Sequence, residues 1–60
     1  MPLVVKHLPT KVLETTVESL KVKGFKCKED TLLGFRVVEC SKHLNELSNY
    51  TYLLFEEKPN

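Results

Sequence analysis

The sequence has no long hydrophobic run, almost no net charge and no recognisable catalytic motif, and each absence argues against a class of protein. No apolar stretch approaches the ~20 residues of a membrane span, so we expect no membrane segment. Nine basic residues against eight acidic ones leave a net charge of +1, which gives little field to attract a phosphate backbone. No phosphate loop, Ser-His-Asp set or paired-carboxylate site can be recognised. We therefore expect a protein that is not an enzyme and uses no cofactor or metal.

The length and composition predict one small globular domain that spans residues 1–60. The chain is 42% hydrophobic and 28% charged, which is ordinary for a folded protein. A domain of this size buries only ~60% of the surface that its unfolded chain exposes, so its core is thin. Such chains usually need a disulfide, a metal or a partner subunit for stability. The two cysteines and an interface with a second copy are the candidates for that contribution.

Apolar periodicity predicts the element order β-α-β-β-β. Strands are expected at residues 3–8, 25–29, 32–40 and 50–57, and a helix begins after residue 9 and ends before residue 24. Residues 41–49 are polar and form either a single helical turn capped by Ser41 or a loop. A β-α-β crossover makes the first strand parallel to a neighbour, and short connections make the later strands antiparallel. The expected fold is α+β, with a single helix packed on one face of a four-stranded mixed, mostly antiparallel sheet.

The expected helix has its own start and stop signals. Thr10 is a candidate N-cap, and Gly24 is a candidate for the first residue beyond the helix. One stripe of side chains at helical spacing should face the sheet; it consists of Val12, Leu13, Thr16, Val17 and Leu20.

The strands carry more apolar side chains than one helix can cover. Val37 and Val38 are adjacent, and so are Leu53 and Leu54, and adjacent strand residues point to opposite faces. Runs of this kind indicate a sheet with both faces covered, and the simplest second cover is another copy of the chain. We therefore expect a homodimer. The expected interface residues are Val38, Leu53, Tyr50, Tyr52 and Phe35.

The two cysteines allow two hairpin registers. A turn centred on Asp30-Thr31 places Cys27 near Gly34, whereas a turn at Leu33-Gly34 places Cys27 opposite Cys40. Only the second register brings the Cα atoms within the ~7 Å that a disulfide needs. Asp-Thr is the better turn sequence, and we therefore predict the first register and two free thiols.

A zinc site is the alternative use of the cysteines. Cys40 and His43 have a C-x-x-H spacing, and His7 and Cys27 would complete a set of four ligands. Structural zinc usually shows two tight ligand pairs, and this sequence offers one. Two strand cysteines and two surface histidines are the favoured interpretation.

Five aromatic residues fall on expected strands, where they can form a core or stack on single-stranded bases. They are Phe25, Phe35, Tyr50, Tyr52 and Phe55. The stretch LVVKHLP at residues 3–9 resembles the first strand of an RNA-recognition motif. The aromatic-rich second motif of that family has no match in LLGFRVVEC. Nucleic-acid binding through the sheet is therefore an alternative, not the favoured function.

The N-terminus supports one hypothesis of an enzyme. A terminal proline at Pro2, followed by strand, helix and strand in a chain near 60 residues, resembles the 4-oxalocrotonate tautomerase family in outline. The resemblance implies that Pro2 would act as a general base. Lys11 stands roughly where that family has an arginine, and the family's glycine-rich C-terminal hairpin is not visible.

The favoured function is a small non-enzymatic binding or regulatory protein that uses a sheet face or edge to contact a larger macromolecular partner. Small chains of this kind are often inhibitors, including phage or viral proteins that target host factors. No signal peptide is recognisable in MPLVVKHLPTK, and we expect a cytoplasmic protein.

Overall fold

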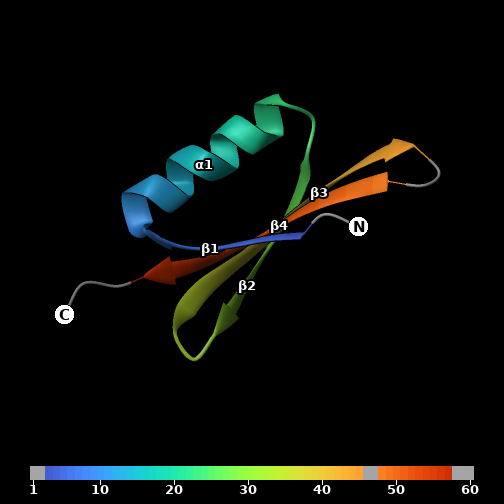
Figure 1. Cartoon of the computed structure of the whole chain (residues 1–60). Coiled ribbons are helices and arrows are strands. Elements are labelled where there is room, and N and C mark those ends of the chain that lie inside the picture. The colour runs from blue at the N-terminus through green and yellow to red at the C-terminus, as the bar shows by residue number, and fades with distance from the viewer. Residues whose placement is uncertain (1–2, 46–47, 58–60) are drawn as a thin grey trace.

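One helix lies across one face of a four-stranded sheet, in the predicted element order (Figure 1). The computed structural model describes residues 3–45 and 48–57. Its elements are β1 (Leu3–Pro9), α1 (Thr10–Val22), β2 (Lys26–Leu32), β3 (Phe35–Asn45) and β4 (Ser48–Glu57). The strands lie in the order β1-β4-β3-β2, with β1 parallel to β4 and the other neighbours antiparallel. The predicted α+β fold is therefore confirmed.

The helix connects the two edges of the sheet. β1 and β2 follow one another in the chain around α1, yet β4 and β3 lie between them. The helix consequently passes over the two central strands (Figure 1). β1 joins the sheet only through β4, the last strand in the chain, so the β1 edge forms only once the C-terminal strand is in place.

The C-terminal end of α1 is the predicted one, and its N-terminal end is not. Gly24 has φ of +96°, its N–H donates to the Lys21 carbonyl, and the Phe25 N–H donates to the Leu20 carbonyl. This is the Schellman pattern, in which glycine tolerates the left-handed backbone. Pro9, rather than Thr10, is the N-cap and makes no side-chain cap hydrogen bond, and the Thr10 hydroxyl donates to Glu56.

The core lies between α1 and the central strands. Among the residues whose burial the structure describes, six side chains are buried there: Leu13, Val17, Leu20, Val38, Cys40 and Leu54. The predicted helix stripe is therefore correct for its three buried members, whereas Val12 is 47% exposed at the margin. So thin a core makes stability depend on each of these side chains.

The β2–β3 hairpin overturns the predicted turn and the predicted free thiols. Leu33 and Gly34 form the turn with φ of 54° and 81°, which is typical of a type I′ hairpin. Cys27 pairs with Cys40 at a Cα–Cα distance of 4.0 Å, and the two form a disulfide. This register pairs every residue of β2 with β3, and it places a glycine where the backbone is left-handed. Both features outweigh the better turn chemistry of Asp-Thr.

Residues 41–49 also differ from the prediction of a helical turn or a loop. β3 continues to Asn45 and β4 begins at Ser48, and residues 46–47 lie outside the described part of the chain. Lys42 pairs with Tyr50, and His43 pairs with Asn49. Polar residues are tolerated in these strands because this end of the hairpin extends past the end of the helix (Figure 1).

Candidate functional site: the open face of the sheet

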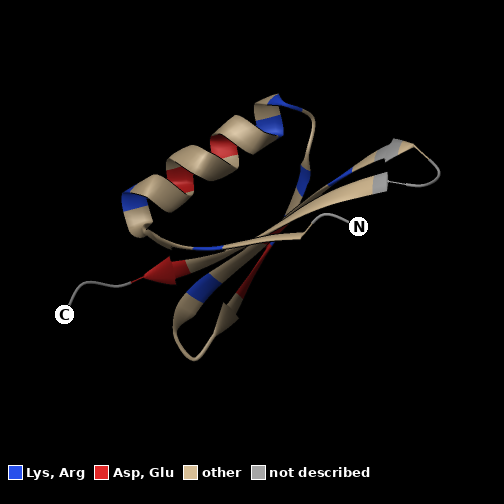
Figure 2. Cartoon of the chain, in the orientation of Figure 1, with Lys and Arg blue, Asp and Glu red and all other residues tan. Residues whose placement is uncertain are grey.

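Among residues 3–45 and 48–57, no element covers the face of the sheet opposite α1 (Figure 2); we call it the open face. Val38 and Leu54 pair with one another and are buried against the helix. Because side chains alternate along a strand, Val37 and Leu53 lie on the open face, and both are half-buried. The adjacent apolar pairs are thus split between the two faces.

Apolar side chains gather on the β1 side of the open face. Leu3 and Val5 are 60% and 49% exposed, and Phe35 on β3 is 44% exposed. Val5 pairs with Leu53, and Phe55 pairs with both His7 and Val37. We call this set the apolar strip, which consists of Leu3, Val5, Leu53, Phe55, Val37 and Phe35. It brings three strands into one continuous apolar surface.

The ring of His7 forms part of the apolar strip's margin. It stacks on Phe55 with ring centroids 5.1 Å apart and an interplanar angle of 18°. The imidazole thereby covers one face of the phenyl ring, and His7 itself is exposed.

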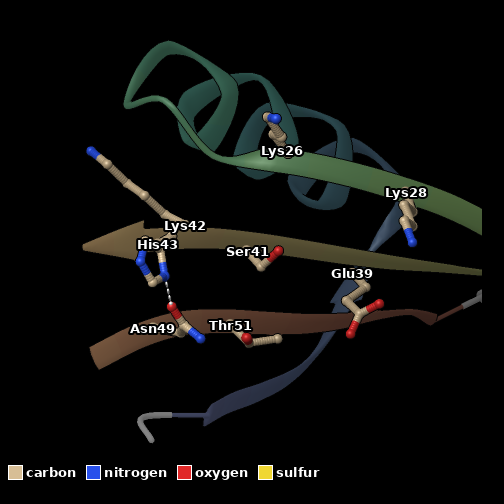
Figure 3. Close-up of a pocket in the computed structure, with 8 residues that line it drawn as sticks. All are labelled: Lys26, Lys28, Glu39, Ser41, Lys42, His43, Asn49 and Thr51. Carbon is tan, nitrogen blue, oxygen red and sulfur yellow. Dashed lines mark hydrogen bonds between the residues drawn. The ribbon is translucent and has the colours of Figure 1, made fainter. Parts of the chain in front are cut away.

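A polar hollow of about 470 Å³ lies beside the apolar strip. Figure 3 shows its lining, with Lys28 and Glu39 on neighbouring strands and His43 directed at Asn49. The His43 Nδ1 and the Asn49 Oδ1 lie 2.5 Å apart, so the ring donates when the proton is on Nδ1. The full lining is Lys26, Lys28, Glu39, Ser41, Lys42, His43, Asn49 and Thr51. The hollow therefore places positively charged, negatively charged and neutral polar side chains next to the apolar strip.

The structure places only two of the predicted interface residues on the open face. Leu53 and Phe35 belong to the apolar strip. Val38 is 1% exposed in the core, so Val37 is the member of that pair on the open face. Tyr52 packs against the core. Tyr50 shares its face, because it lies two residues before Tyr52 on the same strand.

A second hollow, of about 500 Å³, lies on the helix side where α1 ends. The rings of Phe25 and Tyr52 meet edge to face at 5.4 Å. The Lys42 ammonium lies 5.9 Å from the Phe25 ring centroid and donates to the Lys23 carbonyl. Tyr50 and Lys23 complete the lining; we call it the aromatic hollow. It combines three aromatic side chains with two lysines.

Two polar contacts fix the helix over the sheet. Arg36 donates to Glu29 at 2.7 Å and to Glu14 of α1 at 3.3 Å. The hydrogen bond to Glu29, together with the charges of both glutamates, raises the pKa of Arg36 above its ordinary value. One turn earlier in the helix, the Thr10 hydroxyl donates to Glu56 at 2.8 Å, and Glu56 also accepts from the Arg36 backbone N–H at 3.3 Å. Both contacts lie on the helix-covered face of the sheet, so the charged groups that hold the helix are not on the open face.

The structure does not assemble the zinc set considered from the sequence. Cys27 and Cys40 are joined to one another, so neither sulfur is a thiolate ligand. His7 stacks on Phe55 at the β1 side, whereas His43 bonds to Asn49 at the far end of the hairpin. Within the described ranges, no group of three or more His, Cys, Asp or Glu residues is placed to hold a metal ion. Pro2, the proposed base of a tautomerase, lies outside the described residues.

The members of the apolar strip that the sequence-based interpretation missed are Leu3, Val5, Val37 and Phe55. Strand alternation alone does not identify them, because β3 carries charged residues on both faces: Glu39 lies on the same face as Val37, and Arg36 lies on the same face as Val38. The described residues contain no helix with the length and apolar character needed to cross a membrane. No protein-family model, no curated protein and no solved structure matches this chain.

Proposed function

We propose that this chain is a non-enzymatic binding protein whose open face docks on the surface of a larger protein. The observation that carries the proposal is the apolar strip. Its members Leu3, Val5 and Phe35 are 44% to 60% exposed on a face that no described element covers. Contiguous apolar patches on a folded chain are typical of interaction sites.

The layout of the open face supports a protein partner. Protein interfaces combine an apolar centre with a polar, solvated rim. Here the apolar strip is the centre, and the polar hollow with Lys26, Lys28 and Glu39 forms one rim. A partner with its own apolar patch and a flanking charged group would match this pattern. A small chain that binds flat on a larger protein acts by occlusion, which is how an inhibitor of a host factor would work.

Capture from the native host with matched variants tests the proposal. Val37→Glu places a charge in the apolar strip, whereas Val22→Glu makes the same change on the helix, where Val22 is 86% exposed. We expect the captured partner to be lost with Val37→Glu and kept with Val22→Glu, because an unpaired charge is costly to bury in an interface. Circular dichroism must show both variants folded. Equal capture by both variants would contradict docking through the open face.

The aromatic hollow supports a second candidate, the binding of single-stranded nucleic acid. Phe25, Tyr50 and Tyr52 can stack bases, and Lys23 and Lys42 can contact phosphates. Stacking on one aromatic side chain contributes ~1–3 kcal/mol, so Tyr50→Ala should weaken binding of a labelled oligonucleotide by about 5- to 150-fold. Two phosphate contacts predict a log-log salt slope of about −1.4. Binding that is unchanged by Tyr50→Ala would remove this candidate.

The disulfide bears on the compartment. The expectation of a cytoplasmic protein went together with free thiols, and Cys27 and Cys40 are bonded instead. Disulfides persist mainly in oxidising compartments, so this bond favours such a compartment over the cytosol. Mass analysis of alkylated protein from the native host, with and without reductant, would show which state is present.

A further inference from the structure

We infer that the free edge of β1 pairs antiparallel with β1 of a second copy, which joins two four-stranded sheets into one. This inference concerns the sheet edge and is independent of the docking proposed for the open face. It starts from the topology, in which β1 and β2 are the two edge strands.

The two edges differ in how they resist pairing with another chain. Natural proteins guard edge strands with charged side chains, and β2 (KCKEDTL) has four of them in seven residues. β1 (LVVKHLP) has one lysine and no acidic residue. Its members Leu3 and Val5 are also well exposed. The β1 edge, with Lys6 and Pro9 as its guards, is therefore the less protected of the two.

The sequence of β1 suits pairing with itself. An antiparallel pair of identical strands has a two-fold axis, so the assembly closes at two copies. Centring the axis on Val5 places Val5 opposite Val5 of the second copy, Leu3 opposite His7, and Val4 opposite Lys6. Centring it on Lys6 would place two lysines directly opposite one another, which is unfavourable. It would also bring Pro9, which has no N–H to donate, into the ladder.

Pairing through Val5 extends the apolar strip across the axis. Val5 and His7 lie on the open face beside Leu53 and Phe55. The second copy would place the same four side chains on the other side of the axis. The exposed apolar surface of each β1 strand would thereby gain apolar neighbours, and the resulting open face would be about twice as wide.

Cysteine cross-linking along one row of the sheet tests the inference. Val5, Leu53, Glu39 and Lys28 are successive partners from one edge to the other. Val5→Cys should form a covalent dimer rapidly under mild oxidation, because its partner lies directly opposite. Leu53→Cys reports packing of two open faces, and Lys28→Cys reports pairing through the β2 edge. A faster cross-link at either of these positions would overturn the inference.

Two further variants fix the register. Leu3→Cys and His7→Cys should each cross-link poorly alone, since identical positions lie four residues apart, or ~13 Å along the strand. An equal mixture of the two variants should cross-link readily. Light scattering over a dilution series of the unmodified chain should show the mass of a dimer at high concentration. A monomer at every soluble concentration would overturn the inference, whatever the open face binds.

Discussion

The two faces of the sheet begin from the same adjacent apolar pairs and end in different environments. Val38 and Leu54 are 1% and 0% exposed beneath α1, whereas their neighbours Val37 and Leu53 remain half-buried on the open face. One residue along a strand is enough to exchange a core position for a surface position. The comparison teaches that in this chain the apolar content of a strand exceeds what its own fold can bury.

The largest effect that this comparison predicts is a difference in the free energy of unfolding between alanine variants of Leu53 and Leu54. Leu54→Ala removes a fully buried side chain, which costs ~2–5 kcal/mol. At ~0.05–0.15 kcal/mol per residue, the whole domain has only about 3–9 kcal/mol to lose. Leu54→Ala should therefore unfold much or all of the protein, and Leu53→Ala should cost far less. Urea denaturation followed by circular dichroism checks this, and equal losses would mean that the two faces are equally covered.

The second effect concerns the disulfide that ties β2 to the helix-covered face. Cys27 and Cys40 close a loop of 13 residues in sequence separation, and a loop of about that length contributes ~3 kcal/mol. The double variant Cys27→Ala with Cys40→Ala should lower the urea midpoint substantially, and reduction of the unmodified chain should do the same. A thiol reagent should find no free thiol in denatured, unreduced protein. Two reactive thiols there would show that the cysteines are unpaired.

The third effect is smaller and tests how much the ion pairs of Arg36 contribute to the free energy of unfolding. Arg36 links Glu14 of α1 to Glu29 of β2, and the side chains of all three are about a third exposed or more. Exposed ion pairs contribute ~0–1 kcal/mol and weaken with salt. Arg36→Ala should therefore cost less than about 1 kcal/mol at low salt, and less again at high salt.

The pH dependence of that contribution follows from the raised pKa of Arg36. Stability that depends on a raised pKa is fully present below the unfolded pKa and is lost only as pH rises through the folded value. The arginine therefore stays charged over the neutral range, and its contribution should not vary there through its own titration. Lys6→Ala, an exposed lysine on the same face, is the control and should show no comparable salt-dependent loss.

Much of the fold follows from local pattern, whereas the hairpin register does not. The stripe of Leu13, Val17 and Leu20 and the Gly24 stop signal each depend on a few neighbouring residues. The register of β2 depends instead on how many pairs the whole ladder can form. Leu33 is also an unusual residue for a left-handed turn position, so local turn chemistry pointed to Asp30-Thr31.

Two of the five residues named from the sequence, Leu53 and Phe35, lie on the open face, and their role in an interface stays a prediction. Adjacent apolar residues correctly indicated that each face carries a share of them. Which member lies beneath the helix depends on register and on where α1 crosses, and the choice of Val38 for the interface was therefore wrong. Val37 lies on the open face, as does Glu39, which is two residues further along β3. What covers that face stays a prediction.

The smallest effect gives the sharpest test of the comparison between faces. Val37→Thr and Val38→Thr make the same near-isosteric change on adjacent residues of β3. Val38→Thr buries a hydroxyl in the core, at a cost of ~1–3 kcal/mol if it has no partner. Val37→Thr exposes its hydroxyl to water on the open face and keeps a good strand former. Its effect on the free energy of unfolding should lie within about 0.5 kcal/mol. A larger loss that grows with protein concentration would mean that a second copy covers Val37, because pairing through the β1 edge leaves this residue in water.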